Sequence, residues 1–292
     1  MKIILILMIF FSVFAYSNVF KLKTIIPENP FNLGLISSFD IDESGNVYVL
    51  DVRNNTLVIF DKSGCFKWLY PLKTQRAKDI RIFDGNIYIL DPLKRMICKM
   101  KMDGSIVEWI KSKTNLYYPA AISLNQELTA ISDYGNSRIV IIKGKYEYSI
   151  YSELIDSPSA NCISNGDIFV CDWRNGKIFE YNLDSGRFIN SFGGLGIGKE
   201  LFFHPDGIVV KDGLIIISDW GNNKLQIYDK AGKYIMDYYG GKSGFRNPST
   251  LRWKNGFLYV LDSYNLNIRK YSINFSKLKS SLANDIIDGK SK

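Results

Sequence analysis

The 292-residue sequence predicts an all-β fold, a six-bladed β-propeller with four-stranded blades, and three observations support it. Aromatic residues make up 14% of the chain, and its 18 Tyr and 18 Phe favour the half-buried surface of a sheet. Apolar residues form 46% and charged residues 23%, which is enough apolar material for a globular core. A segment of the type Gly45–Asp51 recurs six times, which indicates repeated blades.

Each copy of this repeat is an apolar run that ends in an aspartate. The aspartates follow one another at intervals of 39 to 47 residues and are Asp51, Asp91, Asp133, Asp172, Asp219 and Asp262. Three residues after the aspartate, five copies carry Asn and the second carries Lys94. An interval of about 40 residues accommodates four short strands. We therefore divide each repeat into strands a to d, with the aspartate at the end of strand b.

The six aspartates have a structural interpretation. An aspartate carboxylate accepts backbone N–H groups in the turn that follows it, and Asn tolerates the left-handed backbone that such a turn needs. We predict that the aspartates stabilise the b–c turns. A ring of metal ligands is the alternative.

The last repeat lacks a fourth strand of its own. Strands a, b and c are expected at about 249–253, 257–262 and 266–272, and residues 277–292 are a polar tail rich in Ser and Lys. Residues 19–26 alternate like the outer strands expected at 65–70 and 234–239. We predict that residues 19–26 supply the outer strand of the last blade and close the ring, which also protects the open sheet edge.

The N-terminus has the order of a secretory signal. A positive start at Lys2 precedes the apolar run 3–14, and the small residues Ala15 and Ser17 flank Tyr16 before the expected cleavage. The run is shorter than the roughly 20 residues of a spanning helix, so an uncleaved anchor is the alternative and stable membrane insertion is not expected. We predict a signal peptide over 1–17, export to the periplasm or the exterior, and a propeller over 18–276.

The net charge and the cysteines limit the partners and metal sites that we expect. The net charge is +8, but no long Lys/Arg block is present, so we do not expect nucleic-acid binding by an exported protein. Four cysteines allow three full disulfide pairings, and their spacing with a single histidine fits no zinc site. Their disulfide state stays open; they are Cys65, Cys98, Cys162 and Cys171.

The repeat resembles the NHL family, whose blades carry the pattern G-N-hydrophobic-Y-V-x-D-x-x-N-x-R-hydrophobic. Residues 45–60 and 213–228 match best, and the segments 203–208 and 245–248 are similar to the family's approach to strand a. The resemblance spans about residues 19–276, although Lys94 replaces the Asn in the second copy and the third lacks the Gly-Asn start. It implies a six-bladed propeller, and some relatives with this fold are metal-dependent lyases or lactone hydrolases.

In such a ring the b–c turns and the d–a connections share one face, and here that face gathers aromatic and basic residues. The candidate ligand-binding residues are Arg53, Tyr134, Arg138, Trp173, Arg174, His204, Trp220, Lys224 and Tyr264. This composition suits a protein, peptide or glycan partner. The alternative is that the two tryptophans only pack against neighbouring blades. We expect a monomeric binding scaffold.

Catalytic groups are scarce. His204 is the only histidine, which excludes a site built from several histidines, and no G-x-S-x-G motif is present. We predict no catalytic residue and no cofactor, while a Ca²⁺ or Mg²⁺ ion held in the channel by backbone carbonyls and an aspartate stays open. The alternative function is a metal-assisted lyase or lactone hydrolase with its site in the channel.

Overall fold

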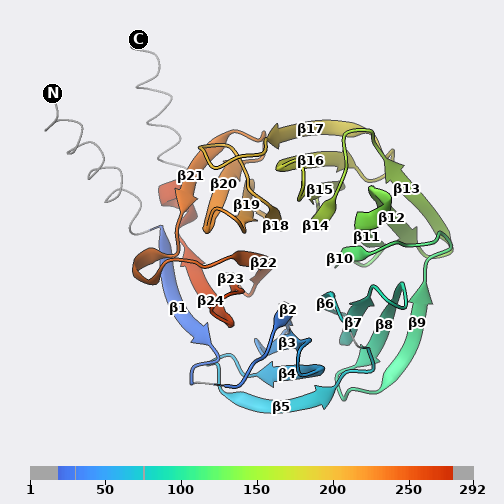
Figure 1. The fold of residues 1–292 in the computed structure, drawn as a ribbon, viewed down its shortest axis with the longest axis vertical. Coiled ribbons are helices and arrows are strands. Elements are labelled where there is room, and N and C mark those ends of the chain that lie inside the picture. Colours follow the sequence, from blue (N-terminus) through green and yellow to red (C-terminus); the bar gives the residue numbers. More distant parts are fainter. Residues whose placement is uncertain (1–18, 30, 75, 279–292) are drawn as a thin grey trace, which may run out of the picture.

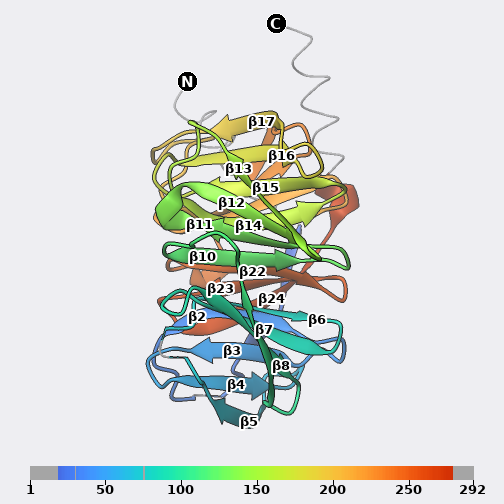
Figure 2. The ribbon, with the colours of Figure 1, turned by 90° about the vertical axis from the view of Figure 1, so that its right-hand side faces the viewer.

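The computed structural model describes residues 19–29, 31–74 and 76–278. They form six four-stranded antiparallel sheets arranged as blades around a central channel (Figure 1). From the side the ring is a thick disc (Figure 2). The predicted six-bladed, all-β propeller is confirmed.

The strands fall into four layers, counted from the channel outward. The inner strands are β2 (Ile36–Ile41), β6 (Asp79–Phe83), β10 (Pro119–Leu124), β14 (Pro158–Ser164), β18 (Pro205–Lys211) and β22 (Pro248–Lys254). The second strands are β3 (Val47–Asp51), β7 (Asn86–Asp91), β11 (Thr129–Asp133), β15 (Asp167–Asp172), β19 (Leu214–Asp219) and β23 (Phe257–Asp262). The third strands are β4 (Thr56–Phe60), β8 (Met96–Lys101), β12 (Arg138–Lys143), β16 (Lys177–Asn182), β20 (Lys224–Asp229) and β24 (Asn267–Ile273). The outer strands are β5 (Phe66–Pro71), β9 (Ile106–Lys111), β13 (Tyr146–Tyr151), β17 (Phe188–Gly193), β21 (Tyr234–Tyr238) and β1 (Phe20–Ile26).

We number the blades 1 to 6 in the order of their inner strands. Every second strand ends at one of the six repeat aspartates, as the sequence predicted. Among the described residues, helix is limited to the short 3-10 helices η1 (Tyr134–Asn136) and η2 (Gly241–Ser243) and one helical turn at 275–278. No helix in this described part of the chain has the length and apolar character needed to cross a membrane.

The first strand closes the ring, also as predicted. β1 lies beside β24 in an antiparallel pair whose register runs from Phe20 opposite Ile273 to Ile26 opposite Ile268 (Figure 1). The two ends of β1 reach different blades. Phe20 stacks on Tyr238 of blade 5, with ring centroids 4.1 Å apart, whereas Ile26 packs into the cluster between blades 6 and 1.

The core is divided between the blades. Each of the clusters of buried apolar residues joins two neighbouring blades, so that blades 5 and 6, for example, share Leu225 and Leu258. Both faces of each blade are therefore covered by its neighbours, which explains why the second strands are long apolar runs. This packing makes each blade depend on its two neighbours for stability.

Two predicted boundaries lie at the ends of the propeller, one after the signal peptide and one before the polar tail. The predicted signal peptide over 1–17 lies outside the described residues. The predicted tail begins at residue 277, but Leu278 is fully buried in the cluster between blades 5 and 6, so the packed part of the chain extends at least that far.

The four cysteines are free thiols, and Cys98 and Cys171 are buried.

Candidate functional site

Five of the six repeat aspartates connect two loops on the same face of the ring, whereas Asp91 accepts hydrogen bonds from the b–c turn of its own blade. Asp172 accepts hydrogen bonds from the backbone N–H of Asn175 in the b–c turn (3.0 Å) and of Asp156 in the d–a connection (2.7 Å). Bonds to a d–a backbone N–H are also made by Asp51, Asp133, Asp219 and Asp262. Since their oxygens already receive backbone and side-chain donors, these carboxylates position the loops of this face.

In blade 2, Lys94 replaces the Asn of the repeat and donates an equivalent hydrogen bond. In other blades the Asn side chain donates to a backbone carbonyl about twenty residues earlier, as Asn136 does to Asn115 at 2.9 Å. The Lys94 ammonium donates to the carbonyl of Lys73 at 3.2 Å, in the corresponding loop. The loop of blade 2 is therefore still hydrogen-bonded to the b–c turn, although Lys replaces Asn there.

Charged residues occur at one repeated position beside the channel. The second residue of the inner strand is skipped by the strand pairing in blades 1, 3, 4 and 5, which is a β-bulge. Bulges re-aim the side chain of the extra residue. In blade 2 the corresponding residue is Lys78, which lies directly before β6 and precedes Asp79 opposite Leu90, as Ser37 precedes Ser38 opposite Leu50. The residues at this position in the six blades are Ser37, Lys78, Ala120, Ser159, Asp206 and Ser249. Only blades 2 and 5 place a charge there, and these blades lie on opposite sides of the ring (Figure 1).

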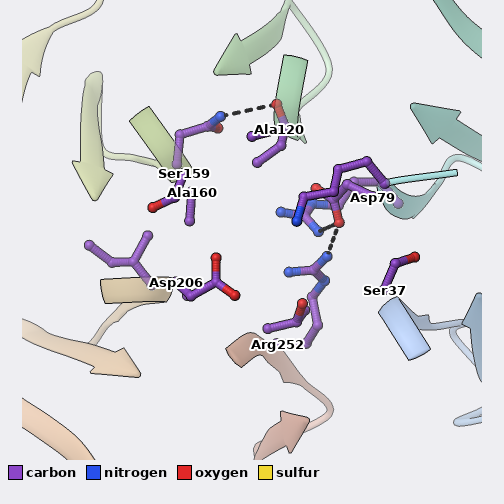
Figure 3. Close-up of a pocket in the computed structure, with 14 residues that line it drawn as sticks. Ser37, Asp79, Ala120, Ser159, Ala160, Asp206 and Arg252 are labelled. Carbon is purple, nitrogen blue, oxygen red and sulfur yellow. Dashed lines mark hydrogen bonds and ion pairs between the residues drawn. The ribbon is translucent and has the colours of Figure 1, made fainter. Parts of the chain in front are cut away.

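Below this position a network of charges fills the channel. Asp79 pairs with Arg252 of blade 6 at 2.7 Å and with Arg81 at 3.3 Å, and Arg252 also lies 3.6 Å from Asp40 of blade 1. Burial raises the pKa of Asp40 to about 6, against the opposing effect of Arg81. The cavity left in the channel is only about 30 Å³, room for little more than a water molecule. Figure 3 shows the ion pair between Asp79 and Arg252.

Asp206 lies in the same cavity but has no such partner. Its half-buried carboxylate points into the channel, and Figure 3 draws no interaction between it and the other lining residues. Burial raises the pKa of Asp206 from 3.8 to about 6, with Lys78 and His204 lowering it and Asp79 raising it. The Asp206 side chain is thus a carboxyl group at the mouth of the channel with no hydrogen-bond or ion-pair partner among the described residues.

A wide pocket opens from this mouth onto the b–c face. Its walls carry four aromatic side chains, Tyr118, Tyr134, Trp173 and Trp220, and its volume is about 470 Å³. Lys78, Ser159 and Asp206 line both this pocket and the narrow channel cavity, so they lie where the two meet. We call it the aromatic pocket. Its volume suits a small molecule or the end of a chain.

A second pocket adjoins the first and differs in charge. It has a volume of about 490 Å³ and shares Lys78, Pro92 and Tyr118 with the aromatic pocket. Its other charged lining residues are Arg53 and Arg76, and no carboxylate lines it. We call it the basic pocket. In the described part of the chain Arg53, Arg76 and Lys78 form no ion pair, so three exposed cations are available to an anion.

His204 supports the aromatic pocket from beneath. Its ring stacks on Trp173, with centroids 4.4 Å apart, and its Nδ1 lies 3.1 Å from the Trp173 carbonyl oxygen. The Phe203 ring also contacts His204, with ring centroids 4.3 Å apart. His204 also has a backbone φ of 69°, in the left-handed region, and the contacts around it must stabilise this conformation. The single histidine thus fixes the orientation of a pocket wall.

The structure brings together part of the candidate surface predicted from the sequence. Tyr134, Trp173 and Trp220 share the aromatic pocket, and Arg53 lines the basic pocket. Outside the pockets, Arg174 is exposed and pairs with Asp156, and exposed Tyr264 lies under the Arg246 guanidinium, which is 3.6 Å from its ring centroid.

Two candidates have to be removed from this surface. Arg138 is buried, with its Nε 2.7 Å from Asp133, and Lys224 is buried, with its ammonium 2.9 Å from Asp237. Both follow a b–c turn in sequence, but they open the third strands β12 and β20 and point into their own blades. Their charges are used inside the fold and are not free to bind a ligand.

The sequence analysis missed Lys78, Asp206 and Arg76. Aligning the inner strands would have revealed the first two, because four blades have Ser or Ala at that position and two have a charge. Arg76 lies in a connection of irregular length, where no repeat register applies.

The unpaired state of Asp206 predicts the stability of a variant. Its raised pKa means that the folded protein binds the proton more tightly than the unfolded chain, so stability falls as the pH rises from about 4 to 6. We expect Asp206→Asn to equal the wild type near pH 4 and to be more stable by about 1–2 kcal/mol at pH 7, a value reduced for solvent in the pocket. Urea unfolding at both pH values measures this difference. A variant less stable than the wild type at pH 7 would show that Asp206 is a structural group.

The space beside Asp40 and Asp79 does not suit a metal ion. In the part of the chain that the structure describes, no group of three or more His, Cys, Asp or Glu side chains is placed to hold one. Two arginines already occupy the space beside Asp40 and Asp79, where their positive charge would oppose a cation.

Comparisons with known proteins agree on the fold. The model of a family described as a 6-bladed beta-propeller matches residues 151–238, from the end of β13 to the end of β21. No curated protein has significant sequence similarity to this chain.

Solved structures resemble most of the ring. Virginiamycin B lyase from Staphylococcus aureus is 16% identical, with a TM-score of 0.62 over 87% of this chain and 100% of the lyase. A streptogramin B lyase is 15% identical, with a TM-score of 0.61 over 87% and 98% of the two chains. A protein of unknown function from Bacteroides thetaiotaomicron is 13% identical, with a TM-score of 0.69 over 87% and 76%. At such identities the likeness shows the fold alone.

Proposed function

We propose that the protein is a binding module that receives its ligand in the aromatic pocket at the mouth of the channel. The observation that carries the proposal is the pocket itself: four aromatic side chains from three blades surround a volume of about 470 Å³ whose base holds an unpaired carboxylate. Aromatic walls supply binding energy with little loss of side-chain entropy. Export through a signal peptide and an NHL type of repeat are part of this proposal.

The contacts around the tryptophans support a pocket that is formed before the ligand arrives. Trp173 stacks on His204, and the ring centroids of Trp173 and Trp220 lie 5.6 Å apart. The repeat aspartates also fix the loops that carry the two tryptophans by hydrogen bonds. A rigid site loses less entropy on binding than a mobile one.

The alternative, a metal-assisted lyase or hydrolase, draws on the lyases among the structural neighbours. Such chemistry requires free ligand groups near the channel. Asp79 pairs with two arginines and Asp40 lies beside one of them. The unpaired Asp206 is not joined by two further His, Cys, Asp or Glu side chains in the described chain that could complete a metal site.

Substituting the two pocket tryptophans tests the binding module. We expect Trp173→Ala and Trp220→Ala each to weaken binding of a responding probe by about tenfold or more, because each removes a pocket wall. Isothermal titration with short peptides and neutral oligosaccharides measures this, with thermal unfolding as a check on folding. Tyr264→Ala is the matched control, since Tyr264 is an exposed aromatic residue of the same face outside both pockets. Unchanged binding in both tryptophan variants would place the site elsewhere.

A further inference from the structure

The two pockets at the channel mouth carry opposite charges. Asp206 of blade 5 lies at the base of the aromatic pocket, whereas Arg53, Arg76 and Lys78 line the basic pocket beside blades 1 and 2. The pockets share Lys78, Pro92 and Tyr118, so a single ligand can occupy both. The mouth is therefore bipolar: one end attracts a cation and the other an anion.

We propose that the site binds a short peptide with both termini free, its ammonium against Asp206 and its carboxylate against Arg53, Arg76 and Lys78. This inference rests on the proposed function, because it assigns a ligand class to the same pocket.

The cationic end of the ligand is defined by two features. The Asp206 carboxylate is an acceptor without a partner in the described chain. Trp173 and Trp220 line the same pocket, and aromatic rings of this kind attract cations. Lys78 lies on the opposite side of the mouth, where the aromatic pocket passes into the basic one. An ammonium is accordingly held on the blade 5 side and repelled from the blade 2 side.

The length of the ligand follows from the arrangement of the charges. The two pockets have volumes of about 470 and 490 Å³, each larger than one amino acid requires. Arg76 and Lys78 come from blade 2, which lies on the opposite side of the channel from blade 5 with Asp206. A free amino acid carries both of its charged groups on one carbon and fills only part of this volume. A tripeptide extends over about 10 Å, and its middle side chain can lie against the aromatic wall.

Four forms of the tripeptide Ala-Phe-Ala test the proposal by isothermal titration at neutral pH and low ionic strength: unmodified, N-acetylated, C-amidated and blocked at both ends. We expect the unmodified peptide to bind and each single block to weaken binding by about tenfold. Asp206→Asn should weaken the unmodified peptide by about tenfold and leave the acetylated peptide unaffected, because its ammonium is already absent.

The other end has a matching pair of measurements. The double variant Arg53→Gln/Arg76→Gln should weaken the unmodified peptide by about tenfold and leave the amidated peptide unaffected. Arg174→Gln is the control, because Arg174 is an exposed arginine of the same face that lines neither pocket.

The outcomes separate this inference from the proposed function. If the unmodified peptide does not bind, or if blocking its ends or changing Asp206 has no effect, the terminus proposal is wrong. The binding module still stands in that case if a blocked peptide or an oligosaccharide binds and Trp173→Ala abolishes its binding. If the peptide binds but both tryptophan variants bind it unchanged, the aromatic pocket is not the site and both proposals fail.

Discussion

Deleting residues 19–26 is expected to abolish cooperative folding of the whole ring. β1 is the only strand of its blade that comes from the other end of the sequence, and it buries Val19, Phe20 and Ile26. Burial of a large apolar side chain contributes about 1.5–3 kcal/mol, so three of them contribute about 5–9 kcal/mol. Total stability is typically about 5–15 kcal/mol. The deletion therefore removes most or all of the margin by which the protein stays folded.

The effect extends beyond blade 6 because β1 contacts three blades. Phe20 stacks on blade 5, the strand pairs with β24 of blade 6, and Ile26 packs in the cluster shared with blade 1. Loss of the thermal transition in circular dichroism would show the collapse. A truncated protein that melts at the temperature of the wild type would contradict the closure mechanism.

Point variants of the same strand provide the control. Phe20→Ala should cost about 3–5 kcal/mol, since it empties a buried aromatic site. Lys21→Ala combined with Lys23→Ala changes side chains that point to solvent in the same strand and should stay within about 0.5 kcal/mol of the wild type.

Asp79→Asn should cause the second large loss of stability, about 3–5 kcal/mol, as expected when one partner of a buried ion pair is removed. Asp79 connects four blades: it belongs to blade 2, pairs with Arg252 of blade 6, and accepts hydrogen bonds from Ser38 of blade 1 (2.6 Å) and from the Ile122 N–H of blade 3 (2.9 Å). An asparagine retains the shape but leaves Arg81 without its ion-pair partner and Arg252 with only Asp40, 3.6 Å away, among the described residues. Urea unfolding at neutral pH measures the loss.

Asp206→Asn is the matched comparison, because both aspartates line one cavity and the substitution is the same. The two variants should change stability at pH 7 in opposite directions, Asp79→Asn downward and Asp206→Asn upward. Such opposite signs are characteristic of a structural charge beside a charge retained for binding. If both variants lost stability alike, the channel would be a single structural network with no free carboxylate.

The sequence predicted the fold nearly completely for a physical reason. A propeller repeats one local pattern, and the aspartate at the end of each second strand appears six times in register, so the blade count could be read directly. The outer strand at residues 19–26 was also predictable, because blade 6 lacked a fourth strand and sheet edges require a partner.

The site was predicted only in part. Tyr134, Trp173 and Trp220 occur in turns whose place on one face follows from the topology, and the structure groups them around one pocket. Arg138 and Lys224 lie near those turns too, yet they begin the third strands and pair with buried carboxylates. Whether a residue at the boundary of a turn points outward or inward depends on side-chain direction, which the sequence period does not resolve there.

By itself, then, the sequence determined the number of blades, their strands, the closing strand and the face that gathers aromatic and basic residues. Only the tertiary structure decided which charges are free. Asp79 and Asp206 are both aspartates near the start of an inner strand, but Arg252, which arrives from blade 6, pairs with one and leaves the other unpaired. Pairing across the channel depends on the distance between blades that are far apart in the chain, and a repeat pattern describes each blade alone.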